Sequence, residues 1–206
     1  MTDFMAMVPG ERRSLLEYLG TLSPEQWTAQ TACAKWNVQQ LTGHLVAAAK
    51  ITAPHFFGGL IKSGFSFDKF IEGDLAKYAE GTPADVMARF NSIIDSNRKP
   101  PGPAYVAFGE IMVHGEDIRR ATGTRGDYKP ELLVALADAY RTTGAPLHGK
   151  KRSAGLKLTA TDVEWSTGTG PEVQGPCMDL IRAITGRRDG LEACSGEGLA
   201  TLGARQ

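Results

Sequence analysis

Apolar residues recur at intervals of three and four along the first 148 residues, which is the periodicity of amphipathic helices. The clearest stretch follows Asn37, a residue type that caps helices. Pro9 and Gly10 interrupt the first stretch, so we expect its regular helix to begin only after them. The Gly- and Phe-rich tract 54–67 predicts the end of a helix and a loop. The pattern predicts a short helix from Ser23 and longer helices over about 3–20, 37–52, 68–80, 82–97, 103–122 and 130–141.

After Gly144 the pattern changes to alternating, β-branched residues, which is typical of short strands. Strands are expected over 156–161, 163–166 and 191–194, and a further helix over 177–185. We therefore predict a mainly α chain in two parts. These are a helical part over about 1–148 and a small α+β module over about 149–206.

Charge and composition narrow the classes of function. Lys+Arg and Asp+Glu balance at 23 each, so nothing indicates a nucleic-acid partner or an anionic membrane surface. The first residues do not read as a signal peptide, and no window is long and apolar enough to predict a membrane span. Cys33, Cys177 and Cys194 are odd in number and far apart, which favours free thiols in a reducing cytoplasm. We interpret them as packed or incidental rather than nucleophilic.

Glu110 and His114 are the first candidates for chemistry, because a spacing of four places both on one face of a helix. That face also carries apolar residues, and an inward carboxylate is costly unless a cation or strong hydrogen bonds compensate it. His44, on the inner face of another predicted helix, could supply a third metal ligand. Three protein ligands leave one position of a tetrahedral site open, which is the catalytic pattern. Asp117 could orient His114 as a hydrogen-bond acceptor.

Other interpretations of these residues stay open at this stage. Glu110 and His114 also fit an ordinary helical hydrogen bond, and His44 also fits a core histidine. The sequence contains no dinucleotide-binding glycine motif, no phosphate-binding P-loop and no nucleophile elbow, so these common enzyme templates do not apply.

Three segments together resemble a known family. Residues 27–45 carry a Trp, then Thr-x-Cys, Trp-x-Val and Leu-x-x-His-Leu. Residues 110–120 read Glu-x-x-x-His-x-x-Asp-Ile-x-Arg, and residues 173–187 contain Val-x-Gly-x-x-x-Asp-Leu before a helix and a Gly-Arg. In this combination the chain resembles the mycothiol-dependent maleylpyruvate isomerase and mycothiol S-transferase family of the DinB-like superfamily.

The resemblance implies a DinB-like four-helix bundle that holds a divalent metal, usually zinc, followed by a sterol-carrier-like α+β module. It implies that His44, Glu110 and His114 are the metal ligands and that they contribute to catalysis by binding the metal. It also implies mycothiol, a low-molecular-weight thiol, as the co-substrate that is joined to small electrophiles.

The resulting hypothesis is a thiol transferase or isomerase in which a metal-bound thiolate attacks a small electrophilic substrate, for isomerisation or for detoxification by transfer. Arg119, Arg120 and Arg187 are candidates for binding a substrate carboxylate, because guanidinium matches carboxylates in a bidentate way. Two alternatives remain: a hydrolase that uses metal-bound water, and a non-enzymatic protein that binds a small molecule. The expected partners are small molecules rather than nucleic acid or membrane, and the chain is expected to be a monomer or a homodimer.

Overall fold

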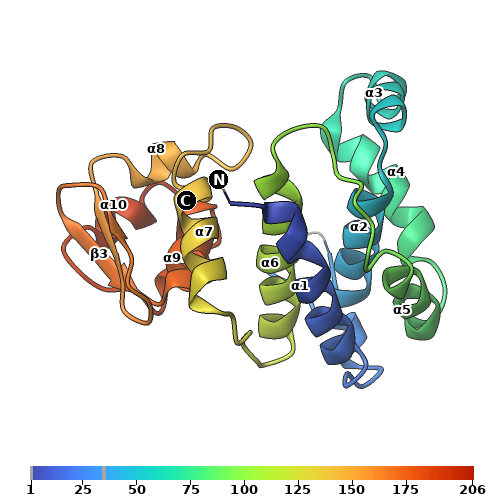
Figure 1. Cartoon of the computed structure of the whole chain (residues 1–206), viewed down its shortest axis with the longest axis horizontal. Helices are drawn as coiled ribbons and strands as arrows, with labels where there is room; N and C mark the ends of the chain where they lie inside the picture. The colour runs from blue at the N-terminus through green and yellow to red at the C-terminus, as the bar shows by residue number, and fades with distance from the viewer. Residues whose placement is uncertain (1, 34–35) are drawn as a thin grey trace. The chain divides into compact units, whose positions relative to one another are not determined.

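The computed structural model describes residues 2–33 and 36–206, apart from the side chains of residues 67, 68 and 74. It divides into two compact units, Met1–Gly126 and Asp127–Gln206, which are described separately (Figure 1). In the first unit the elements are α1 (Phe4–Leu19), η1 (Gln26–Thr28), α2 (Val38–Lys50), α3 (Ala53–Lys62), α4 (Phe67–Ala79), α5 (Pro83–Asn91) and α6 (Ala104–Ala121).

Four of these helices form a bundle. Helix α1 packs against α5 and α6, and α2 packs against the same two helices, so the four close a ring around one core. Helix α4 covers another side of α2, and α3 packs on α4. The core is filled by fully buried apolar side chains, including Leu15, Leu41, Phe90, Phe108, Met112 and Ile118.

The start of α2 is fixed by its own sequence. The Asn37 side chain accepts a hydrogen bond from the Gln40 backbone N–H, and the Gln40 side chain accepts one from the Asn37 N–H. This reciprocal capping box satisfies two donors that a helix start otherwise leaves unpaired. Gly43 then lets α4 approach, because a Cβ at this position would lie 2.8 Å from the Cβ of Ala79. The predicted helix start at Asn37 is confirmed.

Two predictions about the helical unit are wrong. Pro9 lies inside α1 rather than before it, and the tract predicted as a loop contains α3. Packing explains the first case, since Val8 and Arg12 on either side of this proline are buried, and burial outweighs one lost backbone hydrogen bond. Local chemistry explains the second, because the Thr52 side chain caps α3 and Pro54 occupies its first turn, where proline is tolerated.

The second unit contains a three-stranded sheet with the order β2-β1-β3. Strand β1 (Lys157–Ala160) is antiparallel to β2 (Ser166–Thr167) and parallel to β3 (Glu172–Gly175). The helices are α7 (Pro130–Tyr140), α8 (Gly149–Ser153), α9 (Cys177–Ile184), η2 (Arg188–Leu191) and α10 (Leu199–Gly203).

Helix α9, every residue of which is buried, packs against the sheet and against α7. This contact places α7 in the second unit, so the division falls after Gly126 rather than near residue 148. The strand expected over 191–194 is wrong, because the chain there is the end of η2 followed by a turn. The prediction of a mainly α chain with a small sheet is confirmed. The sterol-carrier likeness of the module stays a prediction.

A buried arginine on α1 forms hydrogen bonds to the segment that follows α5. The Arg12 side chain donates hydrogen bonds to the backbone carbonyls of Ile93, at 2.7 Å, and of Ser96, at 2.8 Å. Desolvation by burial lowers the pKa of Arg12 to about 10, and nearby Asp95 opposes this shift. The guanidinium therefore stays charged at neutral pH. Its N–H groups donate to carbonyls that follow the end of α5 and accept no hydrogen bond within a helix.

We expect Arg12→Met to lower the free energy of unfolding by about 2–3 kcal/mol, because it removes the buried hydrogen bonds that Arg12 donates to the carbonyls of Ile93 and Ser96. The neighbouring Arg13 is a matched control, since its ion pair with Asp95 is exposed and such pairs contribute about 0–1 kcal/mol. Urea unfolding of Arg12→Met and Arg13→Met measures both values. Equal losses in the two variants would contradict the role given to Arg12.

Candidate metal centre

A tight loop before α2 sets the surroundings of the candidate site. The Gln30 and Thr31 side chains donate to the backbone carbonyl of Trp36, at 2.9 Å and 2.7 Å. The Trp36 N–H in turn donates to the Cys33 carbonyl at 2.8 Å. These bonds turn the chain back on itself, so Cys33 and Trp36 both reach the bundle. Ala34 and Lys35, which belong to the same sequence signature, lie outside the described residues.

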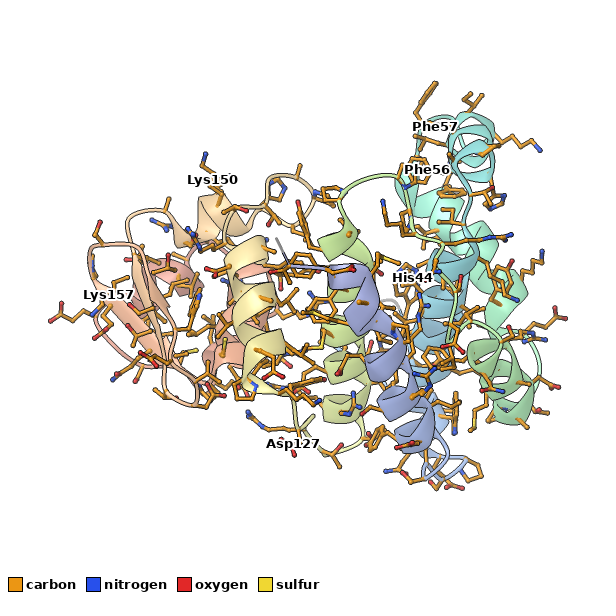
Figure 2. All side chains as sticks on the ribbon, in the orientation of Figure 1. His44, Phe56, Phe57, Asp127, Lys150 and Lys157 are labelled. Atoms are coloured by element: carbon orange, nitrogen blue, oxygen red, sulfur yellow. The ribbon has the colours of Figure 1, made fainter. Side chains whose placement is uncertain are left out.

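Three side chains predicted as metal ligands come together where α2 and α6 face each other. His44 lies on α2 (Figure 2), and Glu110 and His114 lie one turn apart on α6. The Oε2 atom of Glu110 is 2.9 Å from Nε2 of His44 and 3.5 Å from Nε2 of His114. One ligand atom from each of the three residues lies within 4.8 Å of the others. We call His44, Glu110 and His114 the trio.

The donor set of the trio fits a divalent metal. Two imidazole nitrogens and one carboxylate oxygen form a catalytic zinc set, and bonds of about 2.0–2.1 Å at a tetrahedral centre place ligand atoms about 3.3 Å apart. The two observed separations bracket that value. The side chains of His44 and His114 are 12% and 13% exposed, whereas Glu110 is 28% exposed. The trio is thus shielded by the bundle but reachable from the side of Glu110.

Asp117 holds the other nitrogen of His114. Its Oδ2 atom lies 3.0 Å from Nδ1 of His114, and its side chain is fully buried. A carboxylate at this distance favours a proton on Nδ1, which leaves the lone pair of Nε2 directed toward the trio. The structure therefore brings Asp117 to the position that an orienting acceptor requires.

Cys33 is a residue that sequence reasoning missed. Its Sγ atom lies 3.6 Å from Nδ1 of His114 and 3.5 Å from Oδ2 of Asp117, and the three residues form a second group that could hold a metal. The structure thus places Cys33 beside the candidate site, which the sequence interpretation of this thiol as packed or incidental did not anticipate. Its place in the Thr-x-Cys part of the first signature was the available signal. Cys177 differs, because burial raises its pKa to about 12, with Asp162 and Asp138 adding to the shift.

Two of the three arginines proposed for a substrate carboxylate, Arg119 and Arg120, contact side chains outside the trio. Arg119 donates to the Ser14 hydroxyl at 3.2 Å and lies over the Tyr18 ring, both on α1. Arg120 pairs with Glu116 at 2.7 Å on its own helix. Arg187 belongs to the second unit, where its guanidinium donates to the Thr185 hydroxyl at 3.3 Å.

The first unit matches a known family. Residues 8–99 fit the family model described as mycothiol maleylpyruvate isomerase N-terminal domain. This part of the chain is therefore similar to that family. The matched segment includes His44 and ends before α6, so Glu110 and His114 are added to the site by the structure rather than by the match.

Two solved structures share the fold over nearly the whole chain. A crystal structure of the mycothiol-dependent maleylpyruvate isomerase aligns with a TM-score of 0.59 at 15% identity and covers 96% of each chain. A histidine-to-alanine mutant of the mycothiol-dependent maleylpyruvate isomerase gives 0.58 at 14% identity, again with 96% of each chain. The expected DinB-like fold of this chain is thereby confirmed. No curated protein matches the sequence. Among the described residues, no helix is both long enough and apolar enough to span a membrane.

We expect Asp117→Asn to weaken zinc binding about 10- to 100-fold, because an amide does not hold the Nδ1 proton of His114 as a carboxylate does. Glu116→Gln is the matched control, since Glu116 is a buried neighbour that pairs with Arg120 instead. Competition with a chromophoric chelator measures both affinities. If Asp117→Asn binds zinc as tightly as the Glu116→Gln control, Asp117 does not support the site.

Proposed function

We propose that the chain is a metal-dependent thiol transferase or isomerase that uses mycothiol to attack a small electrophilic substrate. The observation that carries the proposal is the convergence of His44, Glu110 and His114 within 4.8 Å. Support comes from the family of residues 8–99 and from a fold shared with the mycothiol-dependent maleylpyruvate isomerase. The three free cysteines agree with a reducing compartment such as the cytoplasm.

The trio would hold the metal, which we propose to be zinc, through Nε2 of both histidines and a Glu110 oxygen. A metal with an open position favours the thiolate form of a thiol, whose pKa near 8.5 otherwise leaves little thiolate at neutral pH. If the thiol stays on the product, the reaction is a transfer; if it leaves again, the reaction is an isomerisation. Both reactions require that the thiolate form first.

The chain's own residues prepare the site. Asp117 keeps the Nε2 lone pair of His114 directed inward through the 3.0 Å contact at Nδ1. The Trp36 ring lies against the His44 ring, with centroids 4.7 Å apart, and excludes water from one face of that imidazole. Glu110 is the most exposed ligand of the three, so a thiol and its electrophile would approach from its side. Arg187 is retained as a candidate for a substrate carboxylate on the chemistry of guanidinium.

Metal analysis tests the ligand assignment. We expect the purified protein to carry about one equivalent of metal and both His44→Ala and His114→Ala to lose it, because two remaining ligands bind zinc weakly. His55→Ala is the control, since His55 is exposed and lies outside the trio. Mass spectrometry of the metal content, combined with turnover assays with and without mycothiol, gives the answer.

Two results would contradict the proposal. Metal content near zero in the unmodified protein, after growth with added zinc, would remove the basis for the trio as a metal site. Turnover of an electrophile at the same rate without mycothiol would favour a hydrolase that uses water.

A further inference from the structure

A second set of metal-ligating side chains lies beside the trio and shares His114 with it. Cys33, His114 and Asp117 each offer one ligand atom, and these three atoms lie within 4.8 Å of one another. The Sγ atom of Cys33 is 3.6 Å from Nδ1 of His114 and 3.5 Å from Oδ2 of Asp117. The Nδ1 and Oδ2 atoms are themselves 3.0 Å apart. We call Cys33, His114 and Asp117 the second group.

The separations within the second group resemble those between the ligands of one zinc ion. Bonds of about 2.3 Å to sulfur and about 2.0–2.1 Å to nitrogen and oxygen, at tetrahedral angles, place sulfur about 3.5 Å from the other two atoms and nitrogen about 3.3 Å from oxygen. The two sulfur distances agree with the first value, and the distance between Nδ1 and Oδ2 is slightly shorter than the second. A zinc ion therefore needs only small shifts of these side chains to bind.

The two groups use opposite nitrogens of the His114 ring. Nε2 faces Glu110 of the trio at 3.5 Å, whereas Nδ1 faces Asp117 and Cys33. Each nitrogen of an imidazole can bind a metal when it carries no proton. An ion bound by the trio therefore leaves Nδ1 for a second ion, and one ring joins the two sites.

The trio binds the first ion because the second group has more to give up. Its members contact one another directly, and an ion must replace these contacts. Two cations on opposite nitrogens of one ring also repel each other, which weakens the binding of the second ion. The Asp117 side chain is fully buried and Cys33 is half-buried, so the second ion would enter past the sulfur.

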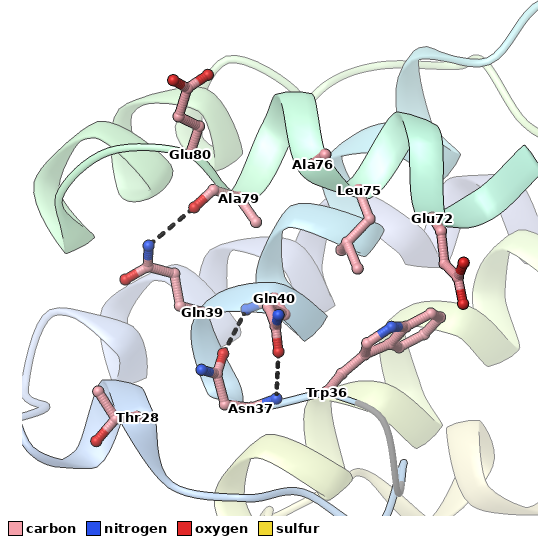
Figure 3. A pocket seen from close by; sticks show the side chains of 10 residues that line it. All are labelled: Thr28, Trp36, Asn37, Gln39, Gln40, Glu72, Leu75, Ala76, Ala79 and Glu80. Carbon is pink, nitrogen blue, oxygen red and sulfur yellow. Dashed lines mark hydrogen bonds between the residues drawn. The ribbon is translucent and has the colours of Figure 1, made fainter. Parts of the chain in front are cut away.

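A second ion would fasten the loop before α2 to α6. Cys33 belongs to this loop, and the other two members of the second group lie on α6. At its other end the loop leads through Trp36 into the capping box that starts α2 (Figure 3). The Trp36 ring lies against the His44 ring of the trio. An ion held by Cys33 thus restrains the loop that covers one side of the trio.

We propose that the second group binds a second zinc ion when zinc is in excess, with His114 as the bridge between the two ions. The proposal rests on the proposed function, because it takes the trio as the first metal site, and it adds a zinc-responsive site to that centre. Thiolate, imidazole and carboxylate are all ligands that zinc accepts. Binding releases the thiol proton of Cys33 and the Nδ1 proton of His114 to solvent.

Cobalt added to full-length protein that carries one equivalent of zinc tests the proposal, with no small thiol present. Zinc does not absorb, so the cobalt spectrum reports the added ion alone, and thiolate-to-cobalt absorption reports a sulfur ligand. We expect about one equivalent of cobalt to bind with thiolate absorption while the zinc, measured by mass spectrometry, is retained.

Variants assign the sulfur. We expect Cys33→Ser and Cys33→Ala to keep the zinc and to lose the thiolate absorption, because a ligand of the second group is removed. Cys194→Ser is the matched control, since it removes a half-hidden alternative: a buried thiol of the second unit that donates to the Gly190 carbonyl at 3.2 Å. It should bind cobalt as the unmodified protein does.

The possible failures can be told apart. If no cobalt binds, if it binds without thiolate absorption or if it replaces the zinc, the second site is wrong and the trio is unaffected. Thiolate absorption that persists in both Cys33 variants, or that disappears in the Cys194→Ser control, would also overturn the proposal. If the unmodified protein binds no zinc at all, the proposed function fails and the second site fails with it.

Discussion

The partial burial of a carboxylate beside two imidazoles between α2 and α6 is the constraint on which the site depends. Glu110 lies 2.9 Å from His44 and 3.5 Å from His114, inside a bundle whose neighbouring positions are apolar. Removing such groups from water costs free energy unless hydrogen bonds or a cation compensate it. The buried carboxylate of Asp117 extends the same cluster through Nδ1 of His114. A cation bound by the trio would offset this desolvation cost. For this reason we interpret the cluster as a metal centre rather than as a set of core hydrogen bonds.

The start of α2 determines where His44 lies in the site. The capping box of Asn37 and Gln40 sets where the helix begins, and His44 follows one turn after Gln40 on the same face. Trp36, directly before the cap, lies with its ring against that of His44.

Much of this could be predicted from the sequence because it depends on local spacing. The interval between Glu110 and His114, and the cap at Asn37, are visible in the residue order alone. Arg119 could have been excluded as well, since five residues after His114 a helical side chain points to nearly the opposite face. Cys33 could not be assigned in this way, because long-range folding of its loop over α6 brings it to His114. Helix α7 was likewise placed in the wrong unit, as its partner α9 lies far along the chain.

X-ray absorption at the zinc edge, recorded before and after saturating mycothiol, tests the central claim most directly. His114 is shared by the trio and by the group of Cys33 and Asp117, and only the second group contains sulfur. The trio account expects nitrogen and oxygen ligands alone at about 2.0–2.1 Å before mycothiol and one added sulfur at about 2.3 Å afterwards. A sulfur ligand before mycothiol is added, or no sulfur after it, would contradict that account.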